Sequence, residues 1–155
     1  VYMRFGRLAL PMVNREDYKF EIGKGVELLE GNDVTIIATG LMVSEALEAA
    51  ETLKAEGINA RVINIATIKP LDEEIVLKAA KETGAIVTAE EHSVIGGLGS
   101  AVCDVLSEKC PTPVLKVGVQ DTFGSSGPAL EVLDKYGLRA RHIVEKAKAV
   151  LALKK

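Results

Sequence analysis

AIVTAEEHSVIGGLGSAV, the stretch at residues 85–102, decides the fold of this chain. It opens with a hydrophobic run at residues 85–89, and an amphipathic run begins at Leu98. Two acids, a histidine and three glycines lie where the two runs join. The pattern predicts a strand, a turn and a helix. In open α/β sheets, the loop that follows a parallel strand is where function usually lies.

The same unit recurs along the chain. Further short apolar runs predict strands at residues 34–38, 62–65 and 114–119. Apolar residues at helical spacing follow the strands and predict helices, one of which Asp72 can cap. Residues 129–136 and 143–151 predict two further helices. Residues 19–31 read as two extended pieces broken by glycine, compatible with a hairpin. We therefore expect an α/β fold: a three-layer sandwich with a mostly parallel sheet of four parallel strands plus one antiparallel strand.

Composition narrows the functional classes. The chain has 155 residues, 48% of them hydrophobic and 26% charged, which suits one globular domain. Its net charge of −3 argues against nucleic acid or an anionic membrane as partner. No apolar run approaches the roughly 18 residues of a membrane span. Cys103 and Cys110 fit no metal or redox spacing, so we expect reduced, structural thiols and a cytoplasmic protein.

The unusual residues fall in segments that follow strands, and these segments emerge at one edge of a parallel sheet. Gly96, Gly97 and Gly99 surround a predicted helix start, where free backbone amides can hold an anion. A tight turn with close helix packing explains the same glycines and is the interpretation we favour. His92 lies beside two acids, which fits either an acid–base pair or a structural or interface role.

The segment at residues 120–127 contains Asp121, Phe123 and the run Ser125-Ser126-Gly127. A serine hydrolase would place its nucleophile in a Gly-x-Ser-x-Gly elbow, and this run has none. A polar turn before a helix explains it better. We expect Glu91, His92, Asp121 and Phe123 to converge at the edge of the sheet and to form a contact surface. The residues alone predict no complete active site, no catalytic residue and no metal site.

Four ordered segments carry a family resemblance. They read GNDVTIIATG at residues 31–40, VINI leading to IKPLD at residues 62–72, EEH followed by GGLG at residues 90–99, and DTFGSSG at residues 121–127. With them the chain resembles the C-terminal domain of the transketolase family of thiamine diphosphate enzymes. The Asp-x-Phe-Gly run, followed by Ser-Gly, is most similar to split transketolases, which are encoded as two polypeptides. Arg139 stands where similar chains often carry a small capping residue, which predicts a weaker helix cap.

The resemblance implies an enzyme that moves a two-carbon ketol unit between sugar phosphates, as in pentose phosphate metabolism. Thiamine diphosphate and Mg2+ would bind to the complete enzyme, and neither would bind to this chain alone. We expect this chain alone to be inactive. The partners implied are the remaining transketolase domains or an N-terminal subunit, in a homo-oligomer whose dimer this domain supports. The alternatives are 1-deoxy-D-xylulose-5-phosphate synthase and a 2-oxoacid dehydrogenase beta subunit. An alternative of another class is a regulatory module that binds an anion or a partner.

The sequence also predicts a functional segment at the opening of the chain. Residues 1–7, VYMRFGR, favour a strand with no preceding element to pair with, which suggests a fragment of a longer protein. By resemblance, residues 1–18 are the last strand of the preceding pyrimidine-binding domain plus a linker, and residues 19–155 are the C-terminal domain. Related enzymes carry an arginine at the position that matches Arg7, and it binds the phosphate of the substrate. A guanidinium suits that role, because its donors match phosphate oxygens in a bidentate fork.

Overall fold

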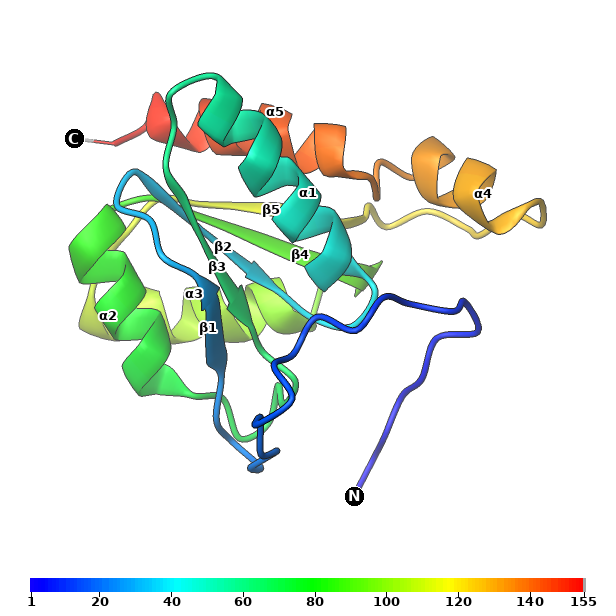
Figure 1. The fold of residues 1–155 in the computed structure, drawn as a ribbon, viewed down its shortest axis with the longest axis horizontal. Coiled ribbons are helices and arrows are strands. Elements are labelled where there is room, and N and C mark those ends of the chain that lie inside the picture. Colours follow the sequence, from blue (N-terminus) through cyan, green and yellow to red (C-terminus); the bar gives the residue numbers. More distant parts are fainter. Residues whose placement is uncertain (155) are drawn as a thin grey trace.

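A five-stranded sheet with helices on both faces organises the chain (Figure 1). The computed structural model describes residues 1–154. The strands are β1 (Val26–Leu29), β2 (Val34–Ala38), β3 (Ala60–Asn64), β4 (Ile86–Ser93) and β5 (Val114–Val119). The helices are α1 (Met42–Ala55), α2 (Glu73–Thr83), α3 (Leu98–Lys109), α4 (Ala129–Lys135) and α5 (Ala140–Leu151).

The strand order is β1-β3-β2-β4-β5, with β2 to β5 parallel and β1 antiparallel to β3 at one edge. Helices α1 and α5 cover one face of the sheet, and α2 and α3 cover the other (Figure 1). The expected three-layer sandwich, with four parallel strands and one antiparallel strand, is confirmed. The antiparallel strand also confirms that residues 19–31 add a strand to the sheet.

Strand β2 shows how the sheet separates two cores. All five of its residues are buried, as expected of a central parallel strand. Ile36 faces the core beneath α1 and α5, where Leu53 and Ile143 are buried. Ile37 points to the opposite face, where α2 and α3 bury Val76 among other apolar residues. Burying each such side chain contributes about 1.5–3 kcal/mol, so both cores hold the sheet in place.

The hairpin expected within residues 19–31 is wrong, because residues 1–25 contain no helix or strand and β1 has no hairpin partner before it. The opening run forms no strand within this chain, and its assignment to the last strand of a preceding domain stays a prediction. A strand needs a neighbour to pair its backbone groups, and the opening runs outside the sheet (Figure 1). Gly25 instead donates its N–H to the Asp72 carboxylate at 2.9 Å. A Cβ at Gly25 would lie 2.6 Å from Ile65 Cδ1, so this backbone packs against β3 and α2.

Strand β4 is longer than expected. It continues to Ser93, so the acids and the histidine that the sequence placed in a turn lie in the strand itself. The register with β5 shifts between Ala89 and Ser93, as in a bulge. Gly118 of β5 allows this path, because a Cβ there would lie 2.9 Å from the His92 carbonyl oxygen.

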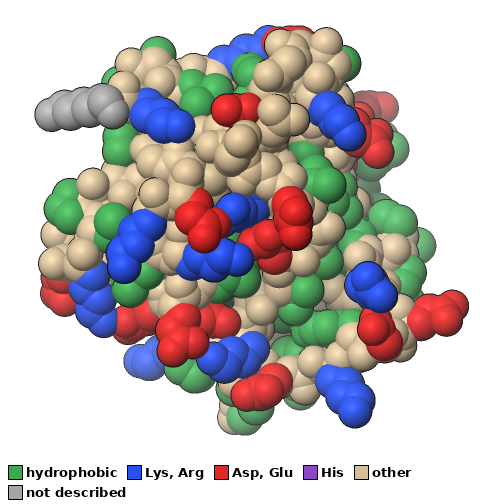
Figure 2. Space-filling model, turned by 60° about the vertical axis from the view of Figure 1, so that its left-hand side comes forward, with side chains coloured by type: hydrophobic (Ala, Val, Ile, Leu, Met, Phe, Trp, Pro, Cys, Tyr) green, Lys and Arg blue, Asp and Glu red, His purple; other side chains and the backbone are tan. Residues whose placement is uncertain are grey.

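The surface carries mixed charge. Figure 2 shows one face on which acidic and basic side chains are interspersed. Among residues 1–154, no helix combines the length and the apolar character needed to cross a membrane.

Candidate functional site

The candidate site is the edge of the sheet where strands β2 to β5 end. Because these four strands are parallel, the segments that follow them leave at the same edge. Three regions there contain the residues that the sequence singled out: residues 90–99, from the end of β4 to the start of α3, residues 120–128 after β5, and the opening residues 1–7. We call residues 90–99 the edge loop and residues 120–136 the arm.

Glu90 organises the edge loop. Its side chain is only 1% exposed, at the end of the buried part of β4. The two carboxylate oxygens accept the N–H groups of Leu98 and Gly99, each at 2.8 Å. These are among the first amides of α3, whose N-cap residue, Gly97, has no side chain that could accept them. A negative charge at the positive end of the helix is favourable, so a glutamate from β4 caps α3.

This cap decides between the two interpretations of the glycines. The Leu98 and Gly99 amides that an external anion would need already bind Glu90. A Cβ at Gly97 would lie 2.0 Å from Glu90 Oε2, and one at Gly99 would lie 2.8 Å from Thr88 Oγ1. Gly96 has a φ of +74°, which a tight turn requires. The geometry therefore favours a turn with close packing over an anion cradle.

Glu91 and His92 lie next to this cap without forming an acid–base pair. His92 is exposed, and its Nδ1 lies 3.2 Å from the backbone carbonyl oxygen of Ser93. Glu91 is half-buried, and its backbone carbonyl accepts a hydrogen bond from Arg4 Nη2 at 2.5 Å. Within residues 1–154 no ion pair joins the histidine to either acid, so general acid–base chemistry has no assembled pair here.

The arm differs from the edge loop in its exposure. Every residue from Gln120 to Glu131 is exposed, and the Phe123 side chain is 99% exposed. The Tyr136 hydroxyl donates to the Phe123 carbonyl at 2.8 Å and lies 3.2 Å from Ser125 Oγ, which ties the two ends of the arm together. Leu133 is the buried residue of α4, and Figure 1 shows this helix lying away from the sheet. The arm thus exposes an aromatic side chain on a segment that is held by hydrogen bonds within itself.

Arg7 lies in the exposed opening segment. The structure brings Arg4 to the edge loop, through Glu91, whereas Arg7 has no hydrogen bond or ion pair with the other predicted site residues among residues 1–154. Leu8 and Val13 pack against the core beneath α1. The segment is therefore attached on either side of Arg7, and the Arg7 side chain is left accessible.

The sequence patterns did not reveal that two buried glutamates cap helices from another element. The first is Glu90, which caps α3. The second is Glu45 of α1, whose carboxylate accepts the Ala140 N–H at 2.6 Å and pairs with Arg139 at 3.1 Å. The expected weak cap at Arg139 is therefore wrong, because α1 supplies the acceptor for α5. Helix starts without Ser, Thr, Asp or Asn are the signal that could have found both, since their free amides need an acceptor from elsewhere.

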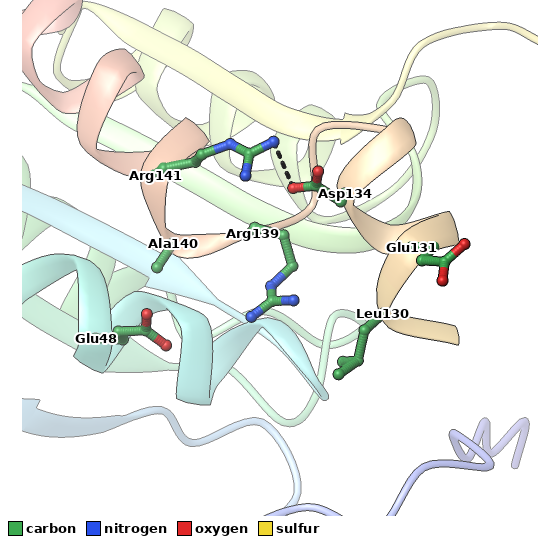
Figure 3. A pocket seen from close by; sticks show the side chains of 7 residues that line it. All are labelled: Glu48, Leu130, Glu131, Asp134, Arg139, Ala140 and Arg141. Atoms are coloured by element: carbon green, nitrogen blue, oxygen red, sulfur yellow. Dashed lines mark ion pairs between the residues drawn. The ribbon is translucent and has the colours of Figure 1, made fainter. Parts of the chain in front are cut away.

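Two hollows in the surface lie away from the predicted residues. One, of about 390 Å3, lies between α1, α4 and the start of α5 (Figure 3). Its arginines are paired, Arg139 with Glu45 and Arg141 with Asp134. The other, of about 460 Å3, lies near the start of β3. None of the predicted site residues lines either hollow.

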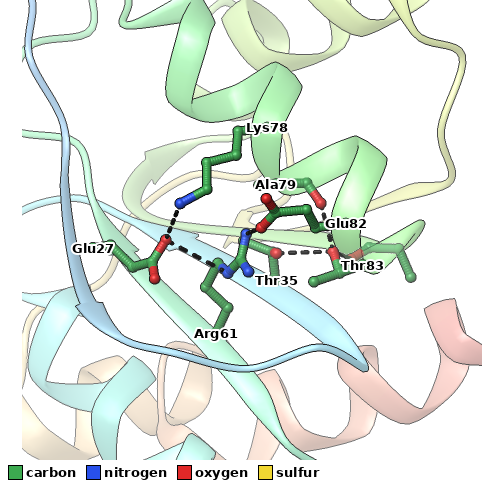
Figure 4. Close-up of polar contacts among 8 residues, drawn as sticks. Glu27, Thr35, Arg61, Lys78, Ala79, Glu82 and Thr83 are labelled. Atoms are coloured by element: carbon green, nitrogen blue, oxygen red, sulfur yellow. Dashed lines mark hydrogen bonds and ion pairs between the residues drawn. The ribbon is translucent and has the colours of Figure 1, made fainter.

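The second hollow borders a buried arginine with acidic neighbours (Figure 4). Arg61 Nη1 lies 2.6 Å from Glu82, and its Nε lies 3.6 Å from Glu27, which Lys78 also approaches at 3.5 Å. The Arg61 side chain is 9% exposed, so these ion pairs offset the cost of burying its charge. This cluster holds β1, β3 and α2 together, and its charges are already matched.

The described residues do not fit a diphosphate and its metal ion. Within residues 1–154, no group of three His, Cys, Asp or Glu side chains could hold a metal. The amides at the start of α3, which could have received a diphosphate, are occupied by Glu90. The edge can therefore form contacts and present Arg7, but no cofactor step can be assigned to it.

Comparison with known proteins gives one consistent result. The family model described as "Transketolase, C-terminal domain" matches residues 23–143. The chain is 51% identical over 150 residues to the 6-deoxy-6-sulfo-D-fructose transketolase subunit SqwH of Clostridium sp. (strain MSTE9), covering 97% of this chain and 47% of that protein. It is 43% identical over 155 residues to 1-deoxy-D-xylulose-5-phosphate synthase 1 of Geobacter sulfurreducens, covering 99% of this chain and 24% of that protein.

A solved structure shows the same fold. It is described as a split gene transketolase, an inactive beta4 tetramer, and it is 56% identical to this chain with a TM-score of 0.93. The match covers 96% of this chain and 49% of that one. The chain thus spans about half the length of the solved relative and of the clostridial subunit.

Proposed function

Because the chain belongs to the transketolase C-terminal domain family, we propose that it is the C-terminal part of a split transketolase whose cofactor is bound elsewhere in the enzyme. The observation that carries this proposal is the 51% identity to a transketolase subunit across 97% of the chain. The complete enzyme would transfer a two-carbon ketol unit between phosphorylated sugars.

The cofactor of the complete enzyme would be thiamine diphosphate with Mg2+, as the family implies. When bound, it supplies the electron sink that stabilises the transferred carbanion. This chain contributes no site for it in our proposal, because Glu90 occupies the amides at the start of α3. The role of the domain is to support the assembled enzyme and to present Arg7.

Residues 1–18 would complete the preceding pyrimidine-binding domain, with residues 19–155 forming the C-terminal domain. Arg7 would then bind the phosphate of the sugar. Its exposure between two attached parts of the opening segment supports this role.

The edge of the sheet would contact the other parts of the enzyme. The exposed aromatic Phe123, together with the exposed polar residues Asp121 and His92, supports an interface. The partner would be an N-terminal subunit, and copies of the enzyme would associate at least as dimers. The tetrameric state described for the 56% identical relative supports self-association. The free cysteines, Cys103 and Cys110, are compatible with a cytoplasmic enzyme.

A second candidate is the C-terminal part of a 1-deoxy-D-xylulose-5-phosphate synthase. The 43% identity to the Geobacter protein over 155 residues favours it. The two reactions differ in the fate of the activated donor: a transketolase cleaves a ketose, whereas the synthase decarboxylates an oxoacid.

The test is an assay of the complete enzyme, this chain together with the upstream residues and any partner subunit. We expect transfer of a ketol unit from fructose 6-phosphate to an aldose phosphate when thiamine diphosphate and Mg2+ are present. Carbon dioxide release from pyruvate that requires an aldose phosphate as acceptor, with formation of 1-deoxy-D-xylulose 5-phosphate and no ketol transfer, would establish the synthase instead. In calorimetry, we expect this chain alone to bind no thiamine diphosphate, and micromolar binding would refute the assignment of the cofactor site to other parts.

Arg7→Ala in the complete enzyme tests the phosphate role. One charge-assisted contact to phosphate contributes about 1.5–3 kcal/mol, so we expect the KM for fructose 6-phosphate to rise roughly tenfold to a hundredfold. Erythrulose, a ketose without phosphate, makes no such contact, and its KM should hardly change. Arg7→Lys should restore only part of the loss, because an ammonium lacks the fork. Equal losses with both ketoses would show that Arg7 is structural.

A further inference from the structure

The opening segment is attached to the edge loop by a single arginine. Arg4 Nη2 donates to the Glu91 carbonyl at 2.5 Å, although the two residues are 87 positions apart in sequence. Downstream, Leu8 and Val13 pack against the core, and Asn14 Oδ1 accepts from Asn64 Nδ2 at 3.4 Å. Arg7 therefore lies between two points of attachment.

The acceptor of this hydrogen bond is fixed. Glu91 belongs to β4, which pairs with β5 on either side of the bulge. The preceding residue, Glu90, is tied to α3 through two hydrogen bonds of 2.8 Å. A carbonyl held in this way gives Arg4 a rigid point at the edge of the sheet.

From these contacts we infer that Arg4 is a positioning residue, which holds the opening segment on the end of β4 so that Arg7 is presented to the sugar phosphate. The inference rests on the proposed role of Arg7. Without Arg4, the opening segment loses its hydrogen bond to the edge loop, and Arg7 samples more conformations. Binding phosphate then costs the entropy of ordering the segment. The loss would fall on substrate binding more than on the chemical step, because the hydrogen bond that Arg4 donates is to a protein carbonyl.

A direct contact of Arg4 with the phosphate is the competing explanation, and a double-mutant cycle separates the two. If Arg4 acts through Arg7, Arg4→Met should have little effect once Arg7 is alanine. If Arg4 binds phosphate itself, the two losses should add. Methionine retains much of the apolar stem of arginine and removes the donor, so it isolates the hydrogen bond.

The experiment compares variants of the complete enzyme with fructose 6-phosphate and with erythrulose. For Arg4→Met we expect the KM for fructose 6-phosphate to rise about threefold to tenfold, since one hydrogen bond is lost. The kcat should stay within about twofold, and erythrulose should be unaffected. In the Arg7→Ala background the effect of Arg4→Met should fall below about twofold. Arg4→Lys retains a donor and should restore part of the affinity.

Arg15→Met is the matched control. Arg15 lies in the same segment, is exposed, and pairs only with the nearby Asp17, at 3.1 Å, among residues 1–154. Its loss should leave both ketoses unchanged. Hydrogen exchange gives a readout independent of activity: amides of residues 1–7 should exchange faster in Arg4→Met than in Arg15→Met.

The outcomes are distinct. If Arg7→Ala is selective for the phosphorylated ketose but Arg4→Met changes neither KM nor exchange, the inference is overturned and the proposed function stands. Equal losses for both ketoses, or additive losses in the cycle, would also overturn it. If Arg7→Ala is not selective, the proposed role of Arg7 fails, and the inference fails with it.

Discussion

Residues 90–99 and residues 120–136 leave the same edge of the sheet, yet Glu90 is 1% exposed whereas Phe123 is 99% exposed. The edge loop is held by a buried carboxylate and by close packing at Gly97 and Gly99, where a side chain has no room. The arm is exposed at every residue from Gln120 to Glu131 and is braced mainly by Tyr136. Both regions carry residues that suggested function in the sequence.

The comparison separates two reasons for unusual residues at the end of a strand. In the edge loop, the glycines and Glu90 satisfy the local demands of a tight turn and an uncapped helix. In the arm, no internal contact requires a phenylalanine at position 123, because its side chain is almost fully exposed. Substitutions should therefore affect stability in the edge loop and contacts with partners in the arm.

The largest effect on stability is expected for Glu90→Ala. It leaves the Leu98 and Gly99 amides without their acceptor and opens a void at the end of β4. We expect the free energy of unfolding to fall by about 3 kcal/mol, measured by chemical denaturation of this chain. If this variant does not fold, Glu90→Gln, which retains one carbonyl oxygen, should still lose about 1–2 kcal/mol. Glu91→Ala is the neighbouring control, and an equal loss there would contradict the capping role.

Gly97→Ala should have the next largest effect. The added Cβ would lie 2.0 Å from Glu90 Oε2, so the carboxylate or the loop must move. We expect a loss of about 2 kcal/mol in the free energy of unfolding. Gly124→Ala in the arm is the control, because a Cβ there meets nothing within 4 Å, and it should change stability by less than about 0.5 kcal/mol. Similar losses in both variants would remove the distinction between the two regions.

The smallest effect on stability is expected for Phe123→Ala in the isolated chain. A side chain that is 99% exposed buries almost no apolar surface, so its removal costs little hydrophobic free energy. The melting temperature of this chain should fall by no more than a loss of about 0.5 kcal/mol in the free energy of unfolding would produce. A larger shift would mean that the aromatic ring packs within the chain.

Local patterns in the sequence were enough for most of the fold. The mostly apolar runs at residues 34–38 and 114–119 coincide with β2 and β5, because a parallel strand covered by helices on both faces is rich in apolar residues. Asp72 caps α2, with its carboxylate accepting the Ile75 N–H at 3.2 Å, and Gly84 ends that helix with a φ of +65°. These signals lie within a few residues of the structure that they determine.

The features that could not be predicted depend on distant contacts. Glu45 reaches the start of α5 across 95 positions, and no local rule links the two. The extension of β4 depends on Gly118 in another strand. The run at residues 1–7 has strand propensity but pairs with no strand among residues 1–154, so here tertiary context overrides propensity. At the candidate site, the sequence identified the edge and its exposed aromatic but missed the buried glutamate that shapes it.

Phe123→Ala in the complete enzyme gives the most direct test that the arm is a contact surface. Sedimentation velocity would measure assembly over a range of protein concentrations, and turnover would be measured at a concentration where the unaltered enzyme is fully assembled. A buried aromatic anchor at an interface often contributes 2 kcal/mol or more, so we expect assembly to weaken by roughly thirtyfold. Turnover per assembled enzyme should be almost unchanged. Unchanged assembly with a lower turnover would show that the edge is catalytic and would contradict this account.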